Sequence, residues 1–249
     1  MTILLHQLSY EQRTFWRSRE AAVFIFIFPL LLYALLSSVY SGDYDGVPAV
    51  DILLAGLFGY GAANTALAGL AIILVGRREA GFLKRVRSTP LPAWTYLAAV
   101  LLSTLVVFAL QAVALLALGG LVFGAAMPEN PLGFAGAVVL GCLCFAGIGV
   151  GAASLIRSAE GVSAVVNVAV LPMAFLSGSF GPTSDDLPDV LQAIADVLPL
   201  TYFLDIVNGV YLEGDSLFAD PRALAVVATW GVAGLAVALR WFSWMPRER

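Results

Sequence analysis

Six long apolar stretches, separated by short polar segments, dominate the pattern of hydrophobic and polar positions along this chain of 249 residues. A helix that crosses the hydrocarbon core of a bilayer needs about 20 mostly apolar residues, and each stretch is close to or above that length. We therefore predict an all-α membrane protein with six transmembrane helices. The predicted spans are Ala21–Tyr40, Asp51–Val75, Trp94–Gly124, Leu132–Ile156, Val162–Phe180 and Arg222–Trp241.

The basic residues indicate how the predicted spans are oriented. Cytoplasmic loops of membrane proteins collect Lys and Arg, and here 12 of the 13 basic residues fall on one side of the predicted spans, with only Arg222 on the other. Acidic residues gather on the opposite side. We therefore predict that both chain ends face the cytoplasm (N-in, C-in). The 12 residues are Arg13, Arg17, Arg19, Arg77, Arg78, Lys84, Arg85, Arg87, Arg157, Arg240, Arg247 and Arg249.

The composition agrees with a protein that lies in lipid. Hydrophobic residues make up 60% of the chain and charged residues 12%, against roughly 45–50% and about 25% in soluble domains. The net charge of −4 gives no indication of a nucleic-acid partner. Cys142 and Cys144 lie in an apolar run and are predicted to be buried structural residues. We expect a multi-pass protein of the bacterial inner (cytoplasmic) membrane.

The N-terminal segment, residues 1–20, has an amphipathic pattern. Leu4, Leu8 and Phe15 share one side of a helix, and Glu11 interrupts that side. Such a helix suits the headgroup region of a membrane, where Phe15 and Trp16 would anchor it. We predict an amphipathic interfacial helix, and a solvated leader is the alternative.

The outer segment, residues 184–220, contains two short amphipathic patterns separated by Pro199. The first follows Asp186 as a candidate N-cap, with Pro188 in the first turn. Each pattern is too short to span a membrane. We predict a re-entrant helical hairpin before the sixth span, because packing against other spans would satisfy its backbone groups. A helical lid on the outer surface is the alternative.

The segment between the second and third spans, GRREAGFLKRVRSTPLP, carries five of the 13 basic residues. Pro90 and Pro92 would end a helix there before the third span. A short cytoplasmic helix with apolar and basic groups suits docking into a soluble partner, and ordinary positive-inside charge with lipid contact is the alternative. One helical face carries Glu79, Phe82, Leu83 and Val86.

Several catalytic classes are excluded by the residues themselves. His6, the sole histidine, precedes the first span, which leaves no partner for an intramembrane serine nucleophile. Lys84, the only lysine, lacks the preceding glycines and following Ser or Thr of a nucleotide-binding loop. We therefore expect no catalytic residue, no metal site and no ATP hydrolysis by this chain alone.

Polar side chains are rare within the predicted spans. Asn64, Gln111 and Asn167 could line a passage or form hydrogen bonds between helices. A proton-coupled carrier needs an acidic relay in a span, and Asp51 and Asp205 are the acids closest to that requirement. Small residues recur every four positions, among them Gly147 and Gly151. We expect them to allow close packing within the bundle, and a seam between two copies of the chain is the alternative.

Three segments resemble the ABC-2 type permease family. RREAGFLKRVRSTPLPAWTYLAA is similar to the family's R-x-E-x-G-T-L-x-x-L-R-x-T-P segment and the span after it. LPMAFLSGSFGP, Leu171–Pro182, matches the end of the fifth span, and PLTYFLDIVNGVYL, Pro199–Leu212, is similar to the motif near the last span. The chain departs from the family at Phe82, where Thr is usual, and at Asn208, where many relatives have Arg.

The resemblance implies a single ABC-2 type transmembrane domain over residues 1–249, with the interfacial helix at 1–20, five spans at 21–180, outer re-entrant helices at 184–220 and the sixth span at 221–242. It also implies a coupling helix from Arg78 to Arg87 that docks on separate ATPase subunits, two per complex, which bind the ATP and Mg²⁺. A second permease, identical or related, would complete the pathway. The implied coupling residues are Arg77, Arg78, Glu79, Gly81, Phe82, Leu83, Lys84, Arg85 and Arg87.

The function implied by the resemblance is the ATP-driven export of a hydrophobic or amphipathic substrate, such as a drug, a lipid or a lipid-linked product. Candidates for the translocation path are Asn64, Gln111, Asn167 and Phe175. An ion-coupled carrier and a membrane anchor or assembly protein without transport are the alternatives.

Overall fold

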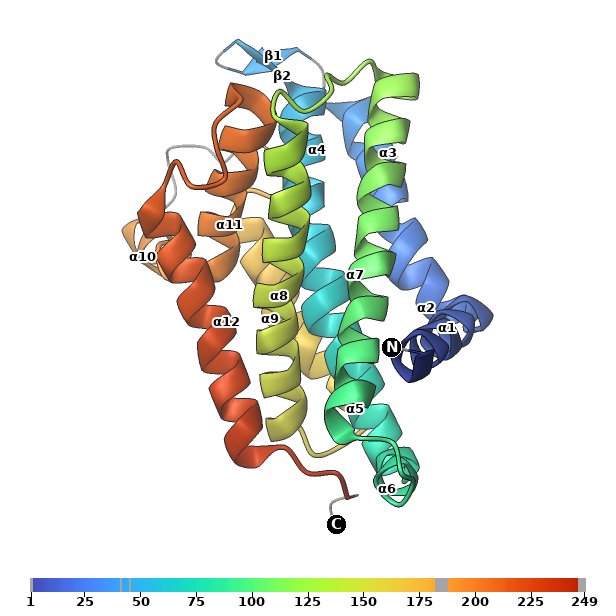
Figure 1. Ribbon diagram of the computed structural model, residues 1–249. Coiled ribbons are helices and arrows are strands. Elements are labelled where there is room, and N and C mark those ends of the chain that lie inside the picture. Colours follow the sequence, from blue (N-terminus) through green and yellow to red (C-terminus); the bar gives the residue numbers. More distant parts are fainter. Residues whose placement is uncertain (1, 41, 45, 182–187, 246–249) are drawn as a thin grey trace.

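The computed structural model describes residues 2–40, 42–44, 46–181 and 188–245, and these residues are mostly helical (Figure 1). The helices are α1 (Thr2–Arg17), α2 (Arg19–Ala22), α3 (Phe28–Val39), α4 (Ala49–Ala62), α5 (Leu70–Glu79), α6 (Phe82–Arg87), α7 (Ala93–Leu118), α8 (Pro131–Leu155), α9 (Val162–Leu176), α10 (Asp189–Ala195), α11 (Pro199–Asn208) and α12 (Pro221–Trp241). Four π-helical turns join or extend them: η1 (Val23–Ile27), η2 (Ala63–Gly69), η3 (Gly119–Phe123) and η4 (Gly209–Glu213). Strands β1 (Asp43–Tyr44) and β2 (Val47–Pro48) form an antiparallel hairpin.

Within the described residues, five continuous helical segments are long and apolar enough to cross a membrane, which confirms five of the six predicted spans. Their bounds differ from the predicted ones by a few residues. The largest difference is at the second span, which was predicted to end at Val75 and continues to Glu79. The five segments are Arg19–Val39, Ala49–Glu79, Ala93–Phe123, Pro131–Leu155 and Pro221–Trp241.

The predicted fifth span, Val162–Phe180, is helical only as far as Leu176. Helix α9 has 15 residues, so at 1.5 Å per residue it extends about 22 Å, less than the roughly 30 Å of a hydrocarbon core. Gly178, with φ of 78°, lies in the turn that follows. Two further apolar helices follow it: α10, and the continuous helix formed by α11 and η4. The chain bends by 75° between these two helices. By length and composition, the described chain thus has five helices able to span a membrane, or six if this bent pair counts as one span.

The second span, which consists of α4, η2 and α5, lies at the centre of the bundle, and nearly all its side chains are buried. Helix α8 packs against it and against α12 (Figure 1). The contact between α8 and α12 is unusually close, because a Cβ on Gly147 would lie 2.4 Å from the Gly231 carbonyl oxygen and one on Gly151 would lie 2.6 Å from that of Gly234. The predicted close packing of small residues within the bundle is confirmed.

Helix α1 confirms that the N-terminal segment is helical. It lies across the spans beside α7 rather than parallel to them (Figure 1). The side-chain amide of Gln12 donates to the carbonyl oxygen of Ser103 at 3.0 Å and to its hydroxyl at 2.9 Å. The helix is therefore attached to the third span through specific hydrogen bonds.

The outer segment forms two short helices, as the sequence predicts, but they differ in burial. Phe203 and Val207 of α11 face the bundle interior, whereas Val190 and Ile194 of α10 are exposed. Helix α10 begins at Asp189, and Pro188 precedes it rather than lying in its first turn. The candidate N-cap Asp186 lies outside the described residues, as does the rest of 184–187. The same holds for the basic tail residues Arg247 and Arg249.

Candidate coupling site

The basic segment between the second and third spans divides into two parts. Arg77, Arg78 and Glu79 form the last turn of α5, and α6 begins only at Phe82. The segment predicted as one helix from Arg78 to Arg87 is therefore not continuous, and only Phe82–Arg87 lies in α6. Gly81 separates the parts, because its φ of 68° lies in the left-handed region that ends a right-handed helix.

Helix α6 presents a basic face to the surroundings and an apolar face to the bundle. Leu83 and Val86 are buried, which anchors the helix beneath the spans. Lys84, Arg85 and Arg87 are exposed. Helix α6 lies at one end of the bundle, opposite the β1–β2 hairpin and on the same side as the C-terminal end of α12 (Figure 1).

Arg77 connects the end of the second span to three other elements. Its guanidinium group forms an ion pair with Glu11 of α1 at 2.6 Å and donates to the Tyr96 hydroxyl of α7 at 2.8 Å. The same group lies 5.5 Å from the ring centroid of Phe82 in α6, within the range of a cation–π contact. Helices α1, α6 and α7 thus meet at one arginine.

Arg78 is buried, with 1% of its surface exposed. It donates to the Glu79 carboxylate at 2.8 Å and to the carbonyl oxygens of Ala153 and Ile156 at 2.8 and 2.7 Å. These carbonyls belong to the C-terminal end of α8, where backbone acceptors lack helical partners and a positive charge is favourable. Arg78 therefore joins the second span to α8 and has no surface free for a partner.

The predicted coupling residues thus have two structural roles. The exposed basic side chains are available for docking, and the others hold the end of α5 and the start of α6 against the rest of the bundle. In the sequence, Glu11 stands out because it interrupts an apolar helix face, but the pattern does not identify Arg77 as its partner. No local pattern indicates that carbonyls of α8 surround Arg78. The exposed group is Lys84, Arg85 and Arg87; the attaching group is Arg77, Arg78, Glu79, Gly81, Phe82 and Leu83.

Two of the path candidates, Asn64 and Gln111, form hydrogen bonds inside the chain. Gln111 is fully buried (0% exposed); its amide accepts from the Thr65 hydroxyl at 3.0 Å and donates to the carbonyl of Ile25 at 3.0 Å. The amide of Asn64 donates to the carbonyl of Phe24 at 3.3 Å. Both acceptor carbonyls lie in the wide π turn η1, so these amides hold the first span against the second and third.

The other two path candidates lie on the exposed side of α9. Phe175 is 66% exposed, and its ring packs against that of Phe180 with 4.7 Å between the ring centroids. The Asn167 amide donates to the Ser163 carbonyl one turn earlier in the same helix, at 2.8 Å. The four candidates therefore do not form one lining: two hold spans together, and two lie on an open helix face.

The acidic residues in or near the spans have different surroundings. Asp51, 5% exposed, accepts from the backbone N–H of Ala126 at 2.8 Å and lies 3.5 Å from the Tyr211 hydroxyl. These contacts hold the loop after η3 to the start of α4. Asp205 is exposed on α11. Within the described part of the chain, no three His, Cys, Asp or Glu side chains come together as ligands for a metal ion.

Comparisons with known proteins match most of the chain. The sequence profile of the ABC-2 type transporter family matches residues 5–212. The chain is 24% identical over 205 residues to the putative transport permease YvfS of Bacillus subtilis (strain 168), which covers 82% of this chain and 83% of that protein. It is 28% identical over 167 residues to the probable multidrug ABC transporter permease YbhR of Escherichia coli (strain K12), which covers 66% of this chain and 45% of YbhR. The matched region is thus less than half of YbhR.

Proposed function

Because the chain belongs to the ABC-2 type transporter family, we propose that it is the membrane-spanning permease subunit of an ATP-driven exporter. Permeases of this family work with ABC ATPase partners. In the proposed complex two such subunits bind the ATP and Mg²⁺, and a second permease, identical or related, completes the translocation path. The chain lies in the bacterial inner membrane with both ends in the cytoplasm, and α10 and α11 form a re-entrant hairpin at the outer side.

The observation that carries this proposal is the basic face of α6. A helix held by Leu83 and Val86 and exposing Lys84, Arg85 and Arg87 is suited to an acidic cleft on a soluble protein. Charge complementarity of this kind steers association and fixes how two proteins are oriented. The ATPase subunits would bind here, at the end of the bundle where α12 also ends.

The contacts of Arg77 and Arg78 supply a route from this face into the bundle. When ATP binding brings the two ATPases together, α6 moves with them. Through Arg77 that movement acts on α1 and α7, and through Arg78 it acts on the end of α8. Since α8 packs backbone to backbone with α12, both helices move together, and the paired permeases open a passage between them.

The exposed face of α9 supports a hydrophobic or amphipathic substrate. Val165, Val168 and Phe175 are exposed there. In the proposed complex this face lies toward the second permease, and Asn167 and Phe175 line the path. Drugs, lipids and lipid-linked products suit such an apolar route; the relative YbhR is named as a multidrug permease.

Charge reversal tests the docking face. We expect Arg85→Glu with Arg87→Glu to reduce the amount of ATPase that co-purifies and to reduce transport, while the permease itself remains folded, because both side chains are exposed. Arg13→Glu with Arg17→Glu is the matched control, since it makes the same charge change at exposed positions of α1. An intact complex and unchanged transport in the α6 variant would show that the docking surface lies elsewhere.

A further inference from the structure

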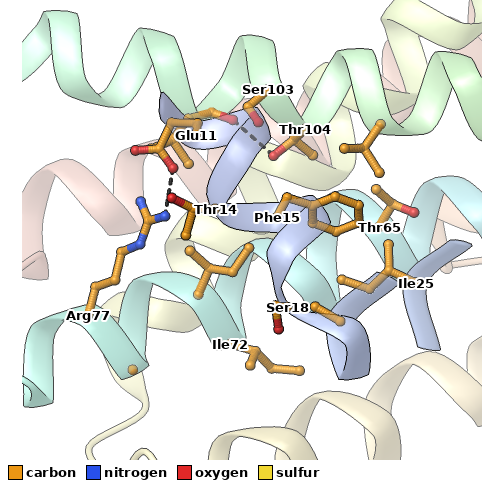
Figure 2. A pocket seen from close by; sticks show the side chains of 15 residues that line it. Glu11, Thr14, Phe15, Ser18, Ile25, Thr65, Ile72, Arg77, Ser103 and Thr104 are labelled. Carbon is orange, nitrogen blue, oxygen red and sulfur yellow. Dashed lines mark hydrogen bonds and ion pairs between the residues drawn. The ribbon is translucent and has the colours of Figure 1, made fainter. Parts of the chain in front are cut away.

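A cavity of about 290 Å³ lies between the N-terminal helix and the bundle (Figure 2). Its walls come from α1, the first span, the second span and α7. None of the contacts proposed for ATPase docking or for the path between two permeases requires this space. Its size is near the lower end of the range of about 300–1,000 Å³ for small-molecule sites.

Most of the cavity wall is hydrocarbon. Phe15, Ile25 and Val107 are among its lining residues. The hydroxyl groups of Thr14 and Thr104 also line it, but each donates to a carbonyl one turn earlier in its own helix, at 2.9 and 3.0 Å. Since a threonine hydroxyl has a single donor, these groups do not require a polar ligand, and the wall suits an apolar one.

One end of the cavity is polar. Glu11 and Arg77 lie there, at the opposite end from Ile25 and Thr65, and the ring of Phe15 lies between (Figure 2). The carboxylate and guanidinium groups neutralise one another through their ion pair. A guanidinium has five N–H donors, and the hydrogen bonds to Glu11 and Tyr96 account for two of them. Arg77 can therefore donate further hydrogen bonds to an oxygen of a ligand.

The length of the cavity corresponds to one leaflet of a bilayer. Thr65 and Arg77 both line it and lie 12 positions apart on the second span, which is about 18 Å along a helix. Half of a hydrocarbon core is about 15 Å. The polar end lies at the end of the span that carries the basic segment, so the cavity runs from the headgroup level toward the bilayer centre.

From these features we propose that the cavity binds one acyl chain of a phospholipid from the leaflet on the basic side, with a phosphate or ester oxygen of its head near Arg77. The lipid fills the space beneath α1 and holds this helix to the second and third spans. The site is separate from the proposed path and does not depend on the proposed function, because the binding requires neither an ATPase nor transport.

Photo-crosslinking of the purified chain in lipid nanodiscs tests this site. The probe is a phosphatidylcholine with a diazirine at the middle of one acyl chain, and mass spectrometry identifies the labelled residues. We expect strong labelling of Phe15, Ile25 and Val107. Gly76→Phe would fill the site, since Gly76 lines the cavity and a Cβ there meets no atom within 4 Å. We expect it to reduce that labelling by about tenfold or more, a loss of at least about 1.4 kcal/mol in binding free energy.

Two controls separate this site from general contact with lipid. Gly76→Ala adds only a methyl group and should leave the labelling unchanged. Val113→Phe adds the same ring on the exposed side of α7, where Val113 is 63% exposed, and should also have no effect. Equal labelling of the cavity residues in wild type and Gly76→Phe, or labelling confined to exposed residues such as Val113, would overturn the proposal. If Gly76→Phe does not fold, a competition experiment on the wild-type protein decides, with unlabelled phospholipid added against the probe. The proposal is supported if more unlabelled lipid is needed to reduce labelling of the three cavity residues than of the exposed residues. It is overturned if both groups of residues lose labelling equally.

Discussion

Arg77 and Arg78 are neighbours in the chain, yet their guanidinium groups bind different parts of the bundle. Arg77 pairs with Glu11 of α1 at 2.6 Å, and Arg78 donates to the Ala153 carbonyl of α8 at 2.8 Å. Adjacent residues on a helix point about 100° apart, so the end of α5 can hold both elements at once. The turn at Gly81 then places α6 directly after this junction.

The first prediction concerns the burial of Arg78. Arg78→Met removes the partner of Glu79 and leaves the Ala153 and Ile156 carbonyls without their donor. We expect the free energy of unfolding to fall by about 3 kcal/mol. This value is at the lower end of the range for breaking a buried ion pair, because the Glu79 carboxylate stays partly hydrated. Thermal unfolding can be followed with a thiol-reactive dye, since Cys142 and Cys144 are buried and free.

The matched control for Arg78 is Arg85→Met, which makes the same substitution on the exposed face of α6. It should change the free energy of unfolding by no more than about 0.5 kcal/mol. Equal melting temperatures for Arg78→Met and Arg85→Met would contradict the assigned role of Arg78.

The second prediction compares two glycines of the same segment. Gly81→Ala forces an alanine to adopt a φ of 68°, and we expect a destabilisation of about 1–2 kcal/mol. Gly76→Ala lies in a regular helical turn with open space at Cβ, and we expect a stabilisation of up to about 1 kcal/mol. A stability measurement that moves both variants in the same direction would show that the turn at Gly81 is not as described.

The third prediction concerns the contact between α8 and α12. A methyl group in Gly147→Ala would lie 2.4 Å from the Gly231 carbonyl oxygen, and the backbone there cannot yield as a side chain can. We expect the helices to separate and the free energy of unfolding to fall by about 1–3 kcal/mol. Gly161→Ala is the control, because its nearest neighbour, the Cβ of Ser158, is 4.0 Å away. The idea fails if the two variants unfold at the same temperature.

The sequence predicts the spans well because their length and apolar character suffice to identify them. It does not predict the early end of α9, because the span was assigned by length and was carried through Ser177 and Gly178 to Phe180. In the structure the backbone turns at Gly178, whose φ is 78°. A row of small residues such as Gly147 and Gly151 indicates a close approach but not the helix that approaches, here α12 through Gly231 and Gly234.

The candidate site could be predicted only in outline. A run of basic residues is visible in the sequence, but the burial of Arg78 depends on where the end of α8 lies in space. The same holds for Gln111, whose amide meets the Ile25 carbonyl 86 positions away in the chain. Such partners come from the packing of the spans, which no local pattern specifies.

The fourth prediction tests the orientation of the chain. Arg85→Cys and Asp43→Cys each place a thiol at an exposed position, at opposite ends of the bundle. In intact cells a membrane-impermeant thiol reagent should label Asp43→Cys but not Arg85→Cys. After permeabilisation it should label both, while the buried Cys142 and Cys144 give little background. Labelling of Arg85→Cys in intact cells would reverse the proposed orientation.

The most direct measurement of the central claim is to tag this chain, extract it gently from native membranes and identify the co-purifying proteins by mass spectrometry. The proposed function predicts an ABC ATPase in stoichiometric amount, and a second, related permease beside it would indicate a heterodimer. If no ATPase appears under conditions that keep a known ABC complex from the same membranes intact, the account is contradicted. A membrane anchor or an ion-coupled carrier would then be favoured.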